Sequence, residues 1–271
     1  MRLPSLLPGL RFGAATSDVL LTPAHSSVND LKTFTTLQLV NVTTLTASRI
    51  LWGKRPGSAN RMFRLPDTSG NVSLTIRRTG GALTYTTSDT PLLQTGTLRW
   101  LATTYDDALT SSAAHIYHGL YGSALVEAIY GTATNGTGAS DASDSANGWA
   151  WFNGQVSPYS AAMQGVGYVA VLWPRVLSLH DLNEVVAGRI AVSGAVVAYA
   201  SGAQGSVAAV DLSGSGNHGT ITGAVLSGEP LLTDLDTPRA VRWKRALFPP
   251  AAAFQAAWAR GANVILQPGI H

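Results

Sequence analysis

The pattern of apolar positions is most continuous between Val166 and Trp173, where residues on both alternating faces of a strand are apolar. One face holds Val166, Tyr168, Ala170 and Leu172, and the other holds Val169, Val171 and Trp173. A strand of this kind is covered on both sides. We therefore expect it to lie in a two-sheet core and to end at Pro174, which cannot donate a hydrogen bond to a strand ladder.

A short helix is predicted directly after this strand. Ser178 stands three residues before Asp181, the spacing at which a hydroxyl and a carboxylate satisfy the first free amides of a helix. Gly188 follows Ala187 at the place where a left-handed residue ends many helices. We expect a helix of about two turns between these signals.

Short alternating segments separated by turn residues fill most of the chain from Leu31 onward. In Val72–Arg77, residues Val72, Leu74 and Ile76 form one face, while Ser73, Thr75 and Arg77 form the other. Gly80 and Gly81 then predict a hairpin with residues 82–87. Further strands are expected within residues 31–40, 47–55, 97–105, 113–120, 124–131, 195–200 and 220–226.

The chain divides into three parts by composition. Residues 1–30 contain three prolines and no sustained period, which predicts an extended N-terminal arm. Residues 31–236 carry the strand pattern, interrupted by residues 132–147, which lack large apolar side chains and are predicted to form an exposed loop. Residues 237–271 place cations beside aromatics and form a basic, aromatic tail.

Charge is sparse and segregated. Only 12% of the residues are charged, about half of the usual fraction of roughly 25%. Residues 31–99 hold nine Lys or Arg against two acids, residues 100–236 hold two Arg against eleven acids, and residues 237–271 hold five basic residues without an acid. Either neighbouring strands mix these blocks in space, or the molecule has oppositely charged surfaces that meet copies of itself or a charged scaffold.

Four stretches together resemble a known family. They are LKTFTTLQLVNVTTLTASRILWGK at 31–54, RWLATTYDDALTSSAAHIYHG at 99–119, YVAVLWPRVLSLHDLNEV at 168–185 and DLSGSGNHGTITGA at 211–224. Their order resembles that in laminin G-like, concanavalin A-like lectin and glucanase jelly rolls. This resemblance implies an all-β, antiparallel two-sheet jelly-roll sandwich, here with N- and C-terminal extensions. It implies little about function, because the same sandwich serves lectins, hydrolases, adhesion modules and viral structural proteins.

Enzymatic chemistry is not expected. The glucanases of this family carry carboxylates on alternate residues of one strand, whereas Glu127, Glu184 and Glu229 belong to no such run. The G-x-G-x-x-G match at residues 214–219 precedes strand-forming residues, so we expect a turn and not a nucleotide-binding helix start. We expect no catalytic residue and no cofactor.

Three groups of residues are candidates for binding a metal or a glycan. His115 and His118 point to opposite faces of a strand and cannot chelate one metal. Asp106–Asp107 and residues 141–147 offer oxygens to calcium but lack the regular spacing of a calcium loop, so no metal is expected. Trp149 and Trp151 share a strand face beside the polar loop and are candidate glycan contacts, unless that face belongs to the core.

The tail supplies the other candidate contacts. Aromatic and arginine side chains dominate interfaces between proteins, and the predicted assembly contacts are Arg242, Trp243, Lys244, Arg245, Phe248, Phe254 and Trp258. A jelly roll between a proline-interrupted arm and such a tail looks like a virion protein of a tailed bacteriophage. The expected function is thus a non-enzymatic virion structural protein, a capsid decoration or fibre component that docks to other virion proteins and to copies of itself. The alternative is a carbohydrate-binding lectin module, or the receptor-binding head of a phage fibre that contacts a host-surface glycan. Neither nucleic acid nor a membrane is expected as a partner.

Overall fold

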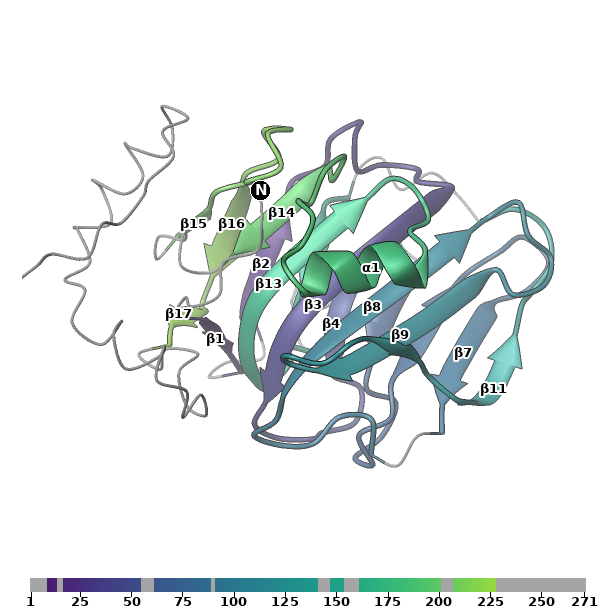
Figure 1. The fold of residues 1–271 in the computed structure, drawn as a ribbon, viewed down its shortest axis with the longest axis horizontal. Coiled ribbons are helices and arrows are strands. Elements are labelled where there is room, and N and C mark those ends of the chain that lie inside the picture. Colours follow the sequence, from purple (N-terminus) through teal and green to yellow (C-terminus); the bar gives the residue numbers. More distant parts are fainter. Residues whose placement is uncertain are drawn as a thin grey trace, which may run out of the picture.

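The computed structural model describes residues 9–13, 17–54, 61–88, 91–140, 147–153, 161–200 and 207–227. These residues form two antiparallel sheets and one short helix (Figure 1). We call the sheet that lies under the helix sheet A. Its strands pair in the order β10-β9-β8-β3-β13-β1-β17, and β14 also pairs with β13. Their bounds are β1 Leu10–Phe12, β3 Thr33–Val42, β8 Leu98–Asp106, β9 Ala114–Leu120, β10 Val126–Glu127, β13 Gly165–Trp173, β14 Val197–Ala200 and β17 Val225–Leu226.

The second sheet, sheet B, runs in the order β11-β7-β6-β5-β4-β12-β2-β16-β15. Its strands are β2 Val19–Thr22, β4 Ile50–Lys54, β5 Arg61–Arg64, β6 Ser73–Ile76, β7 Leu83–Thr87, β11 Tyr130–Thr134, β12 Trp149–Trp151, β15 Ala208–Ala209 and β16 Gly219–Thr222. The predicted fold class is confirmed: the chain is an all-β jelly-roll sandwich with antiparallel sheets.

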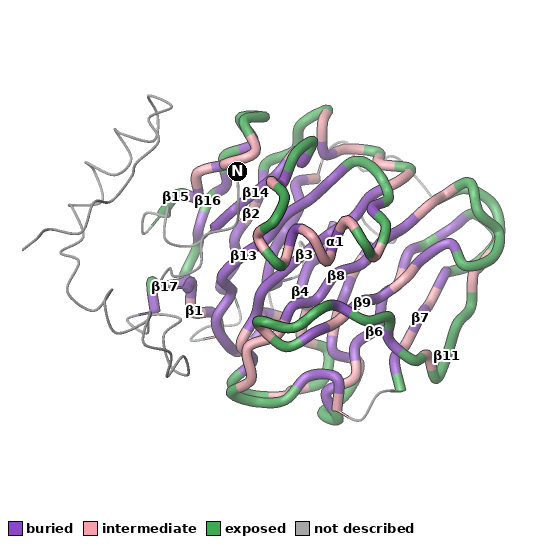
Figure 2. The backbone as a smooth tube through the Cα atoms, in the orientation of Figure 1, coloured by how far each residue is buried: buried purple, intermediate pink, exposed green. Residues whose placement is uncertain are grey.

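The main core lies between the inner faces of the two sheets. It contains buried aromatic side chains from both sheets, and Figure 2 shows burial concentrated along the middle strands. Phe34 of sheet A meets Trp52 and Trp149 of sheet B at centroid distances of 5.7 and 5.5 Å, both edge to face. Such edge-to-face contacts suit the charge distribution of aromatic rings and join the sheets at the centre.

Strand β13 is buried along its whole length, as the apolar pattern predicted. It pairs with β3 on one edge, and its other edge is shared by β1 and β14. A bulge between Gly167 and Val169 shifts the register, so that Tyr168 and Val169 both join the cluster under the helix, while Ala170 and Leu172 face the inner core. The faces predicted for Val166 and Tyr168, before the bulge, are therefore wrong, and those predicted from Val169 onward are correct. The reason is that one inserted residue exchanges the two faces of a strand.

Helix α1, Leu179–Val186, begins and ends at the predicted signals. The Ser178 hydroxyl accepts a hydrogen bond from the Asp181 amide at 3.1 Å, and the Asp181 carboxylate accepts one from the Ser178 amide at 3.4 Å. Gly188 adopts a φ of 67° just after the helix. The apolar side of α1 covers a second cluster on the outer face of sheet A, where Leu182 and Val185 are buried. Among the described residues, no helix is long and apolar enough to cross a membrane.

The predicted hairpin is also confirmed. Strands β6 and β7 pair antiparallel, with Leu74 opposite Tyr85 and Ser73 opposite Thr86. Gly81 lies between them with a φ of 122°, a backbone conformation that side chains with a Cβ rarely adopt. Leu74 and Ile76 are buried in the inner core, which leaves Ser73 and Thr75 on the outer face of sheet B.

The boundary predicted at residue 31 does not separate an arm from the sandwich. In the described part of residues 1–30, β1 pairs with β13 of sheet A, and β2 pairs with β12 and β16 of sheet B. Leu10, Phe12 and Leu20 are buried in the inner core. The short segments carry too few residues to show a period, but their backbone fills strand positions that the sheets leave open.

The exposed loop predicted for residues 132–147 is partly wrong. Residues Tyr130–Thr134 form the edge strand β11, which pairs with β7 after a bulge at Gly131. Ser140 is buried and forms an isolated bridge with Arg78. A strand at a sheet edge can be polar on both faces, so the absence of large apolar residues did not exclude a strand here.

Candidate functional site

The two outer faces of the sandwich differ in what covers them. Helix α1 lies across sheet A over β3 and β8 (Figure 1). In the described residues, no helix covers the outer face of sheet B. Among the residues that the structure describes, no helix therefore packs on the side opposite α1, where sheet B presents a broad surface.

Six hydroxyl side chains form two rows on this outer face. One row crosses the strands through Ser73, Thr86 and Thr132, and the other through Thr75, Thr84 and Thr134. Adjacent strands lie about 4.8 Å apart, and next-but-one residues of a strand lie about 7 Å apart. We call this regular array of six residues the hydroxyl face.

Four of these six hydroxyl groups are available for a ligand, because Ser73 is buried and its hydroxyl is bonded to Thr86. Thr86 donates to Ser73 at 3.1 Å. In the described part of the chain, the hydroxyls of Thr75, Thr84, Thr132 and Thr134 have no hydrogen-bond partner. Thr132 and Thr134 are exposed, and Thr75 and Thr84 are half-buried. Each hydroxyl can donate one hydrogen bond and accept two.

Strand β5 continues both rows with two longer side chains. Arg64 pairs with Ser73, and Met62 pairs with Thr75, so both lie on the outer face beside the hydroxyls. The Arg64 Nε is buried and has no hydrogen-bond partner within the described residues. Arg77, exposed, follows β6. Strands β5, β6, β7 and β11 contain no Asp or Glu, so the charge of this surface is positive.

The structure contradicts the predicted glycan contacts. Trp149 and Trp151 share a face and stack at 5.9 Å as expected, but both have 0% exposure. Trp151 donates its indole N–H to Thr22 at 3.0 Å inside the sandwich. Strand β12 lies between β2 and β4, so its tryptophans fill the core and cannot touch a ligand at the surface.

The predicted assembly contacts Arg242, Trp243, Lys244, Arg245, Phe248, Phe254 and Trp258 lie outside the described residues. Their role stays a prediction.

The predicted hairpin had already placed Ser73 and Thr75 on one face. What it could not show is that Thr84 and Thr86 join them through the register of β6 against β7, and Thr132 and Thr134 through the register of β11 against β7.

The acids weighed for catalysis have local partners. Asp181 caps α1, and its hydrogen bond with Ser178 lowers the pKa of its carboxyl group. Glu184 forms a two-pronged ion pair with Arg189, at 2.5 and 2.8 Å, and this contact lowers the pKa of Glu184. Glu127 lies on β10, far along the chain from both.

The two histidines of β9 and the Asp107 carboxylate also have defined partners. His115 contacts Glu127, while His118 contacts Arg99, in line with the expected opposite faces. The Asp107 carboxylate accepts hydrogen bonds from the Tyr105 hydroxyl and the Ser140 amide. In the described residues, no group of three or more His, Asp or Glu residues is arranged to hold a metal ion.

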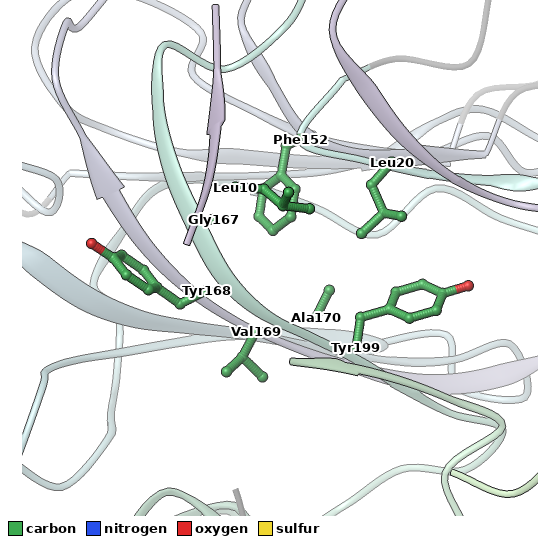
Figure 3. A pocket seen from close by; sticks show the side chains of 8 residues that line it. All are labelled: Leu10, Leu20, Phe152, Gly167, Tyr168, Val169, Ala170 and Tyr199. Atoms are coloured by element: carbon green, nitrogen blue, oxygen red, sulfur yellow. The ribbon is translucent and has the colours of Figure 1, made fainter. Parts of the chain in front are cut away.

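A small internal pocket lies where β13 exchanges β1 for β14 as its neighbour. It has a volume of about 10 Å³ and is lined by Leu10, Leu20, Phe152, Gly167, Tyr168, Val169, Ala170 and Tyr199 (Figure 3). The hydroxyl groups of Tyr168 and Tyr199 point away from the other lining side chains. This apolar space is about the size of one water molecule, which excludes a role as a ligand site.

No protein-family model and no curated protein matches the chain. Solved structures do. A putative carbohydrate-binding protein from Bacteroides ovatus matches with a TM-score of 0.57 and 13% identity over 86% of this chain and 63% of its own. Domains LG4-5 of the mouse laminin alpha1 chain match with a TM-score of 0.40 and 15% identity, over 69% of this chain and 45% of theirs. Tailspike protein 2 of an Escherichia coli O157:H7 bacteriophage matches with a TM-score of 0.43 and 18% identity, over 69% of this chain and 25% of its own.

The first of these likenesses establishes the jelly-roll fold. At 13% identity it establishes the fold alone, and this chain spans less than two thirds of the length of that protein. The other two likenesses, with TM-scores of 0.40 and 0.43, add nothing to this conclusion. A phage origin does not follow from them.

Proposed function

We propose that this protein is a lectin-like carbohydrate-binding module and that its ligand binds on the hydroxyl face of sheet B. The observation that carries this proposal is the pair of hydroxyl rows, of which Thr75, Thr84, Thr132 and Thr134 are exposed or half-buried and which Arg64 and Met62 continue. The B. ovatus protein of the same fold is described as a putative carbohydrate-binding protein, which supports the choice of ligand class.

The chemistry of this face suits a sugar chain. A glycan presents hydroxyls at regular intervals, and each can donate to one threonine and accept from the next. Arg64 adds planar donors that hold a sugar oxygen or carboxylate. Met62 adds an adaptable apolar contact for the carbon face of a sugar ring. Sheet pairing fixes the array before binding, so little conformational entropy is lost when the ligand docks.

The proposed module binds without hydrolysing its ligand. Retaining glycosidases need two carboxyl groups about 5 Å apart on either side of the bond, and the strands of the hydroxyl face carry none. Incubation with a bound polysaccharide should release no reducing ends. Release that disappears in Asp181→Asn, Glu184→Gln or Glu127→Gln would show that the protein is an enzyme.

A triple variant tests the binding site. It combines three substitutions that remove one row of hydroxyls while keeping the β-branched shape of each side chain: Thr75→Val, Thr84→Val and Thr134→Val. Each hydrogen bond contributes about 1 kcal/mol, so affinity for a glycan identified on an array should fall at least about tenfold by calorimetry. Thr44→Val, an exposed residue between β3 and β4, is the matched control. Equal affinity of the triple variant and the wild type would exclude this face.

We also propose that the protein acts as a virion component, a capsid decoration or fibre part, that joins its particle through residues 237–271. Exposed apolar side chains on outer strands, Val126 on β10 and Val225 and Leu226 on β17, offer surface for neighbouring subunits. Deleting residues 240–271 should leave a folded sandwich that no longer joins its particle or oligomer. A truncated protein that assembles normally, or cannot fold, would refute this role.

A further inference from the structure

A second cluster, partly exposed, lies at the β9–β10 edge of sheet A and takes one residue from β11, the edge strand of sheet B. It consists of His115 and Tyr117 on β9, Glu127 on β10 and Tyr130 at the start of β11, and we call it the Glu127 cluster. Glu127 pairs with Tyr117 across the two strands, so their side chains share the outer face. His115 lies two residues away on the same face.

One oxygen of the Glu127 carboxylate is held from two sides. Its Oε1 accepts hydrogen bonds from His115 Nδ1 at 2.6 Å and from the Tyr130 hydroxyl at 3.0 Å. Tyr130 is itself fixed, because its hydroxyl accepts from the Ile116 amide at 2.9 Å. The other oxygen, Oε2, has no hydrogen bond within the described part of the chain, and the side chain is 42% exposed.

The same contact indicates which ring nitrogen of His115 donates to Glu127. An ionised carboxylate only accepts hydrogen bonds, so His115 carries its proton on Nδ1, and in the neutral ring Nε2 is an acceptor. This side chain is 34% exposed. The cluster therefore presents two acceptors side by side, Glu127 Oε2 and His115 Nε2.

Aromatic rings support these acceptors. His115 stacks on Tyr117 with centroids 5.9 Å apart and planes 14° apart. Burial, and secondarily the Glu127 charge, raise the pKa of Tyr117. Burial also raises the pKa of Tyr130, so that its hydroxyl keeps its proton and remains a donor to Glu127.

The charges on this surface have one sign. On the outer faces of β8, β9 and β10, the acidic residues are Asp106 and Glu127. Asp106 lies two residues beyond Thr104, which pairs with His115. Arg99 contacts His118 and lies on the inner face with Leu101. Two acceptors in a negative, partly aromatic surface favour a ligand that donates twice and carries positive charge.

We propose that the Glu127 cluster is a binding site for a primary ammonium group, carried by a sugar with a free amine such as a glucosamine unit. The ammonium donates to Glu127 Oε2 and His115 Nε2, and the half-buried His115 ring, which stacks on Tyr117, contacts the sugar ring. An N-acetylated sugar lacks the charge and two of the three donors. This site shares strand β11 with the hydroxyl face but none of its six residues, so either can fail without the other.

Titration with glucosamine and N-acetylglucosamine tests the site, followed by the NMR signals of the His115 ring. Glucosamine should bind at least about tenfold more tightly, because a charge-assisted hydrogen bond contributes about twice as much as a neutral one. Glu127→Gln keeps the shape and should abolish this preference. Glu184→Gln removes a half-buried carboxylate on α1 and should leave the preference unchanged, as should the triple threonine variant.

Other outcomes refute the proposal. Equal binding of the two sugars, or unchanged binding by Glu127→Gln with an unchanged melting temperature, would show that the cluster is structural. Lysine amide is the third ligand. If it binds as tightly as glucosamine, the site selects the amine alone and the proposed sugar is wrong. If Glu127→Gln unfolds, His115→Gln supplies the same comparison with the carboxylate in place.

Discussion

The side chain of Asn183 in α1 makes two hydrogen bonds with the backbone of Leu125, accepting from its amide at 2.6 Å and donating to its carbonyl at 3.2 Å. Leu125 is buried and precedes β10. These contacts replace a strand partner for Leu125 and fix the helix to the edge of sheet A. They lie next to the Glu127 cluster and thus hold the strand that carries its carboxylate.

Asn183→Leu should destabilise the protein by about 2 kcal/mol. The change leaves the buried amide and carbonyl of Leu125 without partners, which costs about 1–3 kcal/mol. Urea denaturation measures the free energy of unfolding. His180→Ala, an exposed position on the same helix, is the control and should change it by less than about 0.5 kcal/mol. A similar loss in both variants would mean that helix propensity, and not this contact, is responsible.

Arg78 should contribute strongly to the stability of the fold. Its side chain is buried, and the guanidinium donates to the backbone carbonyls of Asp107, Leu109, Asn135 and Gly138 at 2.6–3.3 Å. Arg78→Met should cost about 3 kcal/mol, because these carbonyls lose charge-assisted hydrogen bonds. The neighbouring exposed Arg77→Met is the control in the same thermal melts. A loss below about 1 kcal/mol for Arg78→Met would contradict this.

Trp173→Ala should cost about 3–5 kcal/mol through the cavity it leaves. The indole is 1% exposed, packs in the cluster under α1 and donates to the Ser193 carbonyl at 3.2 Å. Val176→Ala, three residues later and exposed, should have little effect on the denaturation midpoint. A measured cost under about 1 kcal/mol would place the end of β13 at the surface.

The cap of α1 should lose its contribution in acid. The Ser178 hydrogen bond lowers the pKa of Asp181 below its ordinary value of 3.8, so the ionised form is favoured in the folded state. A lowered folded pKa gives stability that is complete above the ordinary value and lost as the pH falls through the folded pKa. Asp181→Asn should therefore be less stable than the wild type at pH 7, and the difference should shrink below pH 4. A difference that is constant from pH 7 to pH 2 would refute a role for the charge.

Local features of the fold could be predicted from the sequence because they depend on neighbours along the chain. The cap at Ser178 and Asp181 needs only three-residue spacing, and the β6–β7 hairpin needs alternation on either side of Gly80 and Gly81. The two apolar faces of β13 likewise predicted complete burial. The bulge at Tyr168 could not be predicted from the sequence, because it depends on how β13 pairs with β3, a strand distant along the chain.

Tertiary structure alone decided which side chains meet at the surface. Trp149 and Trp151 could face a glycan or the core by alternation, and the position of β12 between β2 and β4 places them inside. The hydroxyl rows need the register of β11, and the Glu127 cluster needs the pairing of β9 with β10. Strand order and register arise from contacts between residues distant in sequence, so a local pattern supplies the candidates for a site and the packing of the two sheets selects among them.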